Sequence, residues 1–302
     1  MNCGIVLYKI YDMEGTNKKI ALITGASSGI GRAAAKAFAK DGYIVYGTSR
    51  SAGFTETDLG GVSCMMIPME LADEDSVRGA VEYVIGRHGR IDVVVNAAGS
   101  GIAGAVEDTS AEEARKQFDV CFFGVIRVLN HVLPRMRAAG GGMIINVGSM
   151  ASCFPLAFQS MYGAAKSALL MMTAALRMEV RPFCIKACVV EPGDTKTGFT
   201  DKREFTQKTR GTAYKKPFER ALYEMIRSEL SSPGPEKCAE TILRVSKMKN
   251  PPVRVSVGLK YKVLYILSKF APLRFRQSML EMMYLSNDPP KDAVWTFDRQ
   301  FK

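Results

Sequence analysis

The chain has little histidine. Of its 302 residues only two, His88 and His131, are histidine. Protein metal sites need clustered histidine, cysteine or carboxylate side chains, so we expect no metal site. The seven cysteines are scattered, odd in number and without a CxxC pair. They indicate reduced thiols, as in the cytoplasm, better than a disulfide framework.

Long apolar runs are also missing. No stretch reaches the roughly 18 consecutive apolar residues of a membrane span. The first 19 residues carry Asp12 and Glu14 and lack the basic start and apolar core of a signal peptide. We therefore expect a cytoplasmic protein without a membrane span. Its 47% hydrophobic content suffices for the core of one large α/β domain.

The charge is unevenly distributed. Residues 1–200 hold 20 basic and 19 acidic residues, whereas residues 201–302 hold 21 and 11. Almost all of the net charge of +11 therefore lies in the C-terminal third. Such a segment can attract an anionic ligand or make peripheral contact with a membrane, but a solvated basic face is the more ordinary interpretation. We expect no nucleic-acid partner.

Apolar runs alternate with helical patterns along most of the chain. Runs typical of buried strands cover residues 19–23, 43–50, 62–67, 91–95, 143–147, 185–190 and 253–257. Residues 74–87 and 162–180 have helical patterns, as does a long segment that a capping box opens at Ser110. This long helix is expected to end near Pro134 and the glycines at 140–142. This alternation predicts a doubly wound α/β fold with a parallel sheet.

A glycine-rich turn follows the first predicted strand. The residues 25–31 read GASSGIG, and an alanine-rich helix comes next. Glycines at these places let the backbone approach a pyrophosphate at the positive end of the helix. The spacing is GxxxGxG, and a tight turn without a ligand would also fit it.

Two later positions bear on the adenosine half of a dinucleotide. The exit of the second strand reaches the ribose, where an acidic residue would repel a 2′-phosphate. Ser49 and Arg50 stand there instead, which favours NADP(H), although a surface arginine is the alternative. Glu70 could accept a hydrogen bond from the adenine amino group, or it could be an acid in the first turn of a helix.

Tyr162 and Lys166 are four residues apart, which puts both side chains on one face of a helix. A nearby ammonium lowers the pKa of a tyrosine from its reference value of about 10. The phenol could then give a proton to a forming alkoxide or take one from an alcohol. Ser149 can supply a second hydrogen bond to the same oxygen. Taken alone, the spacing also fits an ordinary amphipathic helix.

Together these motifs resemble the short-chain dehydrogenase/reductase family over residues 18–200. The resemblance implies a seven-stranded Rossmann fold, a homo-oligomer (dimer or tetramer) and hydride transfer between NADP(H) and a carbonyl carbon. Tyr162 would be the acid and base, Lys166 would hold the nicotinamide ribose, and Ser149 would orient the substrate beside Tyr162. The cofactor-binding residues would be Gly25, Ser27, Ser28, Gly29, Ile30, Ser49, Arg50, Glu70, Leu71, Asn96, Ala97, Gly99, Tyr162, Lys166, Pro192, Gly193, Thr195 and Thr197.

Within the family, residues 123–136 and 255–258 resemble the hydroxysteroid and retinol dehydrogenases, which suggests a small apolar alcohol or ketone such as a steroid. One position departs from the family pattern. Cys121 stands where the family usually has an asparagine, and a thiol is a weak donor and acceptor. A non-catalytic NADP(H) sensor or scaffold is therefore the alternative, as is a reductase of a lipid, sugar or other non-steroid carbonyl.

The expected domain organisation has three parts. Residues 1–18 form an N-terminal extension, residues 19–258 the Rossmann domain, and residues 259–302 a helical C-terminal extension. Within the domain, residues 198–236 are a predicted substrate lid, largely helical from Glu204 to Leu230. In the extension, we expect a helix break at Pro272. The apolar side chains of the extension should pack onto the substrate side of the core; they are Val263, Leu264, Ile266, Leu267 and Phe270.

Overall fold

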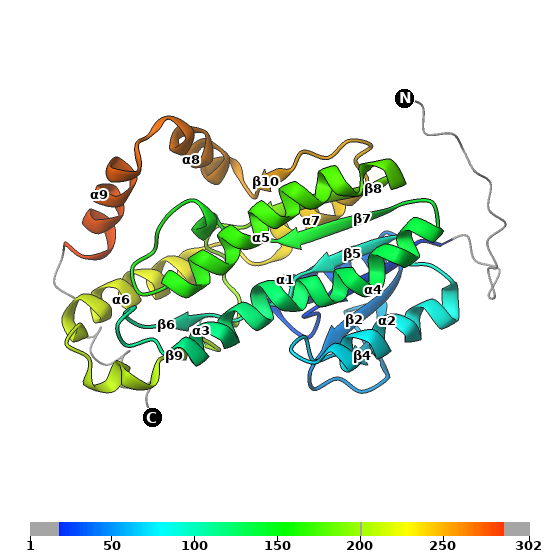
Figure 1. Cartoon of the computed structure of the whole chain (residues 1–302), viewed down its shortest axis with the longest axis horizontal. Coiled ribbons are helices and arrows are strands. Elements are labelled where there is room, and N and C mark those ends of the chain that lie inside the picture. Colours follow the sequence, from blue (N-terminus) through cyan, green and yellow to red (C-terminus); the bar gives the residue numbers. More distant parts are fainter. Residues whose placement is uncertain (1–17, 200, 287–302) are drawn as a thin grey trace.

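The computed structural model describes residues 18–199 and 201–286. A central sheet of eight strands lies between two layers of helices, and a pair of helices extends beyond one edge of it (Figure 1). The predicted N-terminal extension, apart from Lys18, and residues 287–302 of the predicted C-terminal extension lie outside the described residues.

The sheet confirms the predicted fold class and all seven predicted strands. Its strands run in the order β10, β8, β7, β5, β1, β2, β4, β3. Their bounds are β1 (Ile20–Thr24), β2 (Ile44–Ser49), β3 (Thr55–Asp58), β4 (Ser63–Pro68), β5 (Val93–Asn96), β7 (Gly142–Val147), β8 (Ile185–Glu191) and β10 (Arg254–Ser256). The predicted count was wrong by one, because β3 pairs antiparallel with β4 at the edge. Its polar, largely exposed sequence TETD carries none of the apolar pattern of a buried strand.

Successive residues of the central strand β1 supply two cores. Leu22 packs with the helices α2 (Glu74–His88), α4 (Gly124–Ala138) and α5 (Ser160–Glu179) on one face. Ala21 and Ile23 pack with α1 (Gly29–Lys40) and α7 (Glu236–Ser246) on the other. Because strand side chains alternate between faces, both layers are held by the same apolar run.

The long helix predicted from Ser110 to near Pro134 and the glycines at 140–142 is interrupted. A capping box at Ser110 opens α3 (Ala111–Phe118), a π-helical turn covers Asp119–Phe123, and α4 follows directly. The predicted end before the glycines at 140–142 is confirmed, although Pro134 lies inside α4 and does not end the helix. The helix continues to Ala138 and buries Met136 completely, which offsets the backbone hydrogen bond that proline cannot make.

The predicted lid is less helical than expected at its start. The short strand β9 (Glu204–Phe205) pairs in parallel with β6 (Ile102–Ala103), and a 3₁₀ turn follows at Gln207–Gly211. Only then does α6 (Lys215–Ser231) begin. Two backbone N–H groups tie the lid to the loop after β5: Glu204 donates to Gly101 at 2.9 Å and Thr206 to Ala103 at 3.1 Å.

The C-terminal extension breaks at Pro272, as predicted, into α8 (Leu259–Phe270) and α9 (Leu273–Tyr284). The expected packing of its apolar side chains onto the core was wrong. Val263, Ile266, Leu267 and Phe270 are exposed, because α8 turns its opposite side, with the buried Ser268, towards the protein. None of the helices within residues 18–199 and 201–286 is long and apolar enough to cross a membrane.

The cysteines follow the expectation of reduced thiols in part. Five of them are free: Cys64, Cys121, Cys153, Cys188 and Cys238. Cys184, in contrast, is disulfide-bonded, so the expectation was wrong at this position. Among the described residues, no group of three His, Cys, Asp or Glu side chains is placed to hold a metal ion.

Candidate active site

The structure brings Ser149, Tyr162 and Lys166 together. Ser149 follows β7, and the other two lie one turn apart on α5. The Ser149 hydroxyl hydrogen-bonds to Tyr162 and accepts from the Ala151 N–H at 3.2 Å. The buried Lys166 Nζ donates to the Val147 carbonyl at 2.8 Å. Strand β7 thus positions both partners of the Tyr162 phenol.

The electrostatics of Tyr162 differ from the expectation. Burial raises its pKa, and the Lys166 ammonium and the Ser149 hydrogen bond lower it by less; the pKa therefore lies above its ordinary value. The predicted lowering of the pKa was wrong in net direction, because desolvation of a phenolate outweighs one nearby cation here. At neutral pH the phenol is protonated, which is the form that donates a proton to a forming alkoxide.

Phe199, in the lid, covers this phenol. Its ring centroid lies 5.7 Å from that of Tyr162. The ring also packs on Gly101 so closely that an added Cβ there would come within 2.7 Å of it. The predicted lid and the loop after β5 therefore meet directly beside Tyr162.

Cys121 lies in the π-helical turn, fully buried beside the site. Its Sγ accepts from Gln117 Nε2 at 3.1 Å and points at the Ser100 carbonyl at 3.5 Å. A Cβ added to Gly99 would be 3.9 Å from both Cys121 Sγ and Lys166 Nζ, so these two groups face the same small space. The thiol therefore lies at the position from which it could affect the surroundings of the Lys166 ammonium.

Gln117 is a residue that the sequence analysis missed. Its amide is completely buried, accepts from the Ile102 N–H at 2.8 Å and donates to the Ser100 carbonyl at 2.9 Å. With Cys121 as a further partner, both of its polar atoms are engaged. Gln117 therefore holds the loop after β5 and does not replace the missing asparagine. Its position one turn before Cys121 was the available signal.

The glycine-rich turn forms a backbone cradle at the carboxyl ends of β1 and β5. Gly25 has φ of +69°, and a Cβ added there would come within 2.7 Å of Ala98 Cα. A Cβ at Gly31 would come within 2.3 Å of the Gly25 carbonyl oxygen. Only glycine fits both places. The turn leaves Ile30 and Ser28 half-buried and Ser27 exposed.

The start of α1 suits an anionic group. Ser28 is the N-cap residue but makes no side-chain cap, and the first turn carries no acid. The backbone N–H groups of the first turn of α1 are therefore available to a phosphate. Thr197 lies over Gly29, at 3.5 Å from a Cβ added there, and Lys202 Nζ donates to the Ser28 hydroxyl at 3.2 Å. These residues fit the pyrophosphate of a dinucleotide.

The strand exits place the remaining predicted cofactor residues along the same edge of the sheet. Ser49 ends β2, and Arg50 is exposed directly after it. Asn96 is buried and donates to Asn146 at 2.8 Å, so its side chain joins β5 to β7. The backbone N–H of Ala97 donates to the Thr24 hydroxyl at 3.1 Å.

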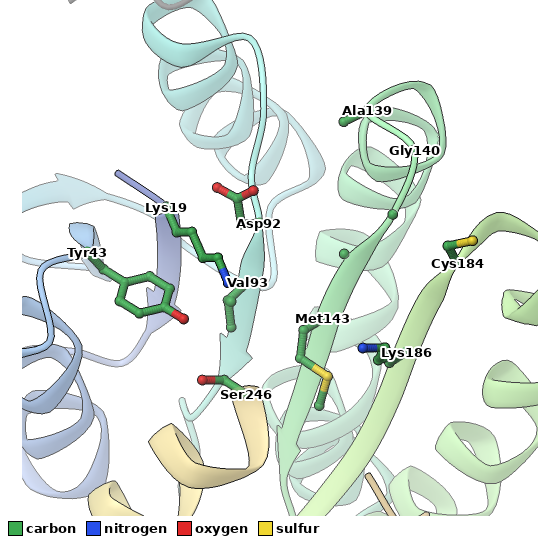
Figure 2. Close-up of a pocket in the computed structure, with 12 residues that line it drawn as sticks. Lys19, Tyr43, Asp92, Val93, Ala139, Gly140, Met143, Cys184, Lys186 and Ser246 are labelled. Atoms are coloured by element: carbon green, nitrogen blue, oxygen red, sulfur yellow. The ribbon is translucent and has the colours of Figure 1, made fainter. Parts of the chain in front are cut away.

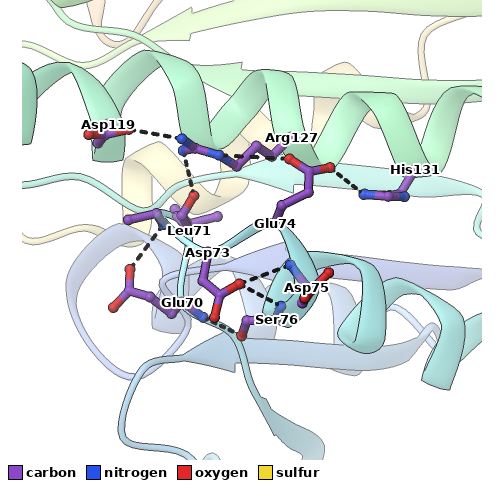
Figure 3. Close-up of polar contacts among 10 residues, drawn as sticks. Glu70, Leu71, Asp73, Glu74, Asp75, Ser76, Asp119, Arg127 and His131 are labelled. Carbon is purple, nitrogen blue, oxygen red and sulfur yellow. Dashed lines mark hydrogen bonds and ion pairs between the residues drawn. The ribbon is translucent and has the colours of Figure 1, made fainter.

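Glu70 and Leu71, the residues predicted to lie at the adenine, are in the loop after β4. The Glu70 carboxylate accepts from the Ala72 N–H at 3.1 Å, within its own loop and ahead of the N-cap Asp73 of α2. Arg127 of α4, another residue that the sequence analysis missed, donates to the Leu71 carbonyl at 2.9 Å and pairs with Asp119 at 3.0 Å (Figure 3). This network fixes the loop that carries both predicted residues.

The loop after β8 carries the last of the predicted cofactor-binding residues. The Pro192 carbonyl accepts from the Met150 N–H at 3.0 Å, and the Thr195 hydroxyl donates to the Gly193 carbonyl at 3.0 Å. Tyr261 of α8 lies so close to Gly193 that an added Cβ would overlap its ring. The C-terminal extension is thereby in contact with the predicted nicotinamide side of the site.

A buried ion pair supports this loop from behind. Glu191, at the end of β8, is completely buried and pairs with Arg254 of β10, and Ser152 donates to its carboxylate at 2.5 Å. Burial raises the pKa of Glu191, whereas Ser152 and Arg254 lower it by less. Arg254 also stacks on the Tyr265 ring at 3.8 Å. The sequence analysis did not recognise this pair, whose members are 63 positions apart in the sequence.

A pocket of about 280 Å³ lies at the opposite end of the sheet. Lys19, Tyr43, Asp92 and Lys186, at the starts of four strands, line it (Figure 2). Ligands of doubly wound folds bind at the carboxyl ends of the strands. This pocket is therefore separate from the site of Tyr162.

A family model described as short chain dehydrogenase matches residues 19–208. The chain belongs to the short-chain dehydrogenase family. The family resemblance of the sequence is thus confirmed, together with oxidoreductase chemistry at CH–OH or keto groups.

Two named relatives of this short-chain dehydrogenase are reductases. It is 40% identical over 268 residues to the 3-ketodihydrosphingosine reductase of Bacteroides thetaiotaomicron, covering 88% of this chain and 98% of the relative. It is 34% identical to the NADPH-dependent 1-acyldihydroxyacetone phosphate reductase of Schizosaccharomyces pombe, covering 61% of this chain and 62% of that one. The suggested hydroxysteroid branch finds no support in these two.

A solved structure shares the fold closely. The short-chain dehydrogenase from Streptomyces avermitilis superposes with a TM-score of 0.73 at 30% identity, covering 88% of this chain and 97% of that chain. The match extends well past the family model, so the segment that follows residue 208 also has a counterpart in the family.

Proposed function

We propose that the protein is an NADP(H)-dependent reductase of the ketone of a single-chain amphipathic lipid, with 3-ketodihydrosphingosine as the leading candidate. The observation that carries the chemistry is the Tyr162 phenol, hydrogen-bonded by Ser149 and protonated beside Lys166. The similarity to a 3-ketodihydrosphingosine reductase over 98% of its length supports the substrate class. Arg50 at the exit of β2 supports the choice of NADP(H).

In this proposal the bound NADPH supplies a hydride to the carbonyl carbon. Tyr162 donates its proton to the carbonyl oxygen as the alkoxide forms, and Ser149 donates a hydrogen bond to the same oxygen. Lys166 stabilises the phenolate that remains, since its ammonium favours the charged form of Tyr162. Phe199 keeps water from the reacting atoms.

Apolar packing fixes the predicted lid to the body of the protein. Phe218 and Leu222 of α6 are buried in a cluster with Ala103, Phe158 and Phe205, beside the loop that carries Gly101. This packing holds α6 next to the loop after β5.

A buried ion pair lies in the predicted lid. Arg203 Nη2 and Glu229 Oε1 are 2.5 Å apart, and the Arg203 side chain is completely buried. The Glu229 carboxylate is one of the groups that raise the pKa of Tyr162. We infer that this pair holds the predicted lid in place near the reacting phenol.

The test is a screen of NADPH oxidation. The ketones would be 3-ketodihydrosphingosine, an acyldihydroxyacetone phosphate, a steroid ketone and retinal, each with NADPH and with NADH. We expect the highest kcat/KM for 3-ketodihydrosphingosine with NADPH. A preference for the steroid would contradict the lipid assignment, and cofactor binding without any turnover would indicate a sensor.

The family resemblance also carries a proposal on assembly. Met171 and Met178 are exposed at 72% and 73% on α5, an apolar surface that a second copy could cover. We expect a dimer or tetramer by light scattering and its dissociation in Met178→Glu. An unchanged mass in the variant would contradict an interface at this place.

A further inference from the structure

The first helix of the C-terminal extension has an exposed apolar stripe. Its members are Leu259, Val263, Ile266, Leu267 and Phe270, spaced i, i+4, i+7, i+8 and i+11, so they share one face of α8. Leu259 and Phe270, at its two ends, are exposed at 77% and 82%. In a water-exposed helix this spacing would normally face a core, yet here it faces outwards.

Lysines border the stripe on both sides. With about 100° between successive residues, Lys260 falls beyond one edge of the stripe, and Lys262 and Lys269 fall beyond the other. All three are exposed. From Leu259 to Tyr284 the chain has five basic residues and one acid, Glu281. The apolar surface is therefore framed by positive charge.

The second helix extends this surface. On α9, Phe275 and Met282 are exposed at 63% and 66% and lie seven residues apart, on one side of the helix. Arg274 is exposed next to them. Figure 1 shows α8 and α9 standing out from the body of the molecule, beyond β10 and alongside α6. We call the two sets of exposed apolar and basic side chains the outer face of α8 and α9.

The inner side of the same helices is joined to the active site. The Tyr261 hydroxyl accepts from the Asp194 N–H at 3.0 Å, next to Gly193. Arg276 Nη1 donates to the Cys153 carbonyl at 2.7 Å, in the loop after Ser149. Arg220 of α6 donates to the Leu285 carbonyl at 3.0 Å. The extension is therefore fixed to the loop after β8, to the loop after β7 and to α6 of the predicted lid.

We propose that the outer face of α8 and α9 docks the protein on an anionic lipid bilayer. Apolar side chains framed by lysines are typical of helices that lie in a membrane interface, with the ammonium groups at the level of the lipid phosphates. A second copy of the same face would bring like charges together, which disfavours a symmetric contact between copies. Docking goes beyond the proposed function and does not depend on the identity of the ketone.

The position of the face explains what docking would achieve. A single-chain lipid ketone resides in the bilayer and must leave it to reach Tyr162. The helices that touch the bilayer are the ones that hold the rim of the site, through Tyr261 and Arg276. Docking would therefore place the edge of the site that Tyr261 and Arg276 hold next to the bilayer, from which a lipid substrate would enter.

Sedimentation of the full-length protein with vesicles tests the proposal, in phosphatidylcholine alone and in phosphatidylcholine with phosphatidylglycerol. We expect pelleting with the anionic vesicles at low salt, and at least a tenfold weaker partition at high salt, because exposed charges are screened. The double variant Leu267→Glu, Phe270→Glu should abolish it. Phe54→Glu is the matched control and should pellet like the wild type: Phe54 is exposed at 59%, as Leu267 is at 57%, but precedes β3 at the opposite edge of the sheet.

A second variant separates charge from apolar contact. The substitutions Lys260→Gln, Lys262→Gln and Lys269→Gln keep the apolar stripe and should still lower partition to anionic vesicles at least tenfold. Equal pelleting of this variant, the double glutamate variant and the wild type would overturn the proposal. A wild type that does not pellet would also overturn the proposal. If light scattering then shows an oligomer that the double glutamate variant dissociates, the outer face of α8 and α9 belongs to a contact with a second copy. Unchanged NADPH binding in each variant shows that it is folded.

Discussion

Tyr162→Phe removes a single oxygen atom from the centre of the site and tests the assignment of the proton donor. The ring keeps its packing against Phe199, whose centroid is 5.7 Å away, and the fold should be unaffected. General acid catalysis by a positioned side chain contributes about 10²- to 10⁴-fold. At about 1.36 kcal/mol for each factor of ten, the variant should lose about 2.7–5.4 kcal/mol of transition-state stabilisation.

The assay is the steady-state oxidation of NADPH with the lipid ketone, with cofactor affinity measured separately by fluorescence. We expect kcat to fall at least about a hundredfold and the NADPH affinity to change less than about threefold. Near-normal turnover in Tyr162→Phe would refute the mechanism, whereas a lost NADPH affinity would show that the variant had disturbed the cradle instead.

The raised pKa of Tyr162 adds a pH dependence with a definite sign. Reduction needs the protonated phenol, so kcat/KM for the ketone should be independent of this group from neutral pH to about pH 10 and should fall above that. Oxidation of the alcohol needs the phenolate and should rise over the same range. A reduction rate that falls between about pH 6 and 8 would contradict the direction of the pKa shift.

Three further variants test other parts of the site. Arg50→Ala should weaken NADP(H) binding about ten- to a hundredfold in calorimetric titration and leave NAD(H) unchanged; tighter binding of NAD(H) by the wild type would contradict this. Cys121→Asn should keep or raise turnover and Cys121→Ala should lower it, whereas equal rates in all three proteins would exclude the thiol from the relay. Arg254→Met leaves the buried acid Glu191 without its cation and should lower the free energy of unfolding by about 3–5 kcal/mol in urea. Arg227→Met, at an exposed pair, should cost at most about 1 kcal/mol, and equal losses would contradict the role of burial.

The sequence predicted the elements that carry a periodic pattern. All seven parallel strands were apolar runs, and the alternation with helices then specified their arrangement. The same holds for Tyr162 and Lys166, because a one-turn spacing on a helix brings them together by local geometry. Their recognition as a site with Ser149 needed the other motifs of the chain, since this spacing alone also fits an ordinary amphipathic helix.

Features that depend on distant partners were missed. The charge of Glu191 is matched by Arg254, and neither position has a local sign of the other. The pKa of Tyr162 depends on the burial of its phenol in the folded chain, which outweighs the ammonium that the sequence does show. Likewise, the apolar stripe of α8 reads as a core face, and only the folded chain shows that it points outwards.

The pairing of β6 with β9 has a consequence for turnover. Two backbone hydrogen bonds join the lid to the loop after β5, and the same loop carries Gly99 beside Lys166 and Cys121. A substrate that lifts the lid must either break those bonds or pull the loop away from Lys166. Opening of the predicted lid would therefore disturb the surroundings of Lys166 until both hydrogen bonds form again.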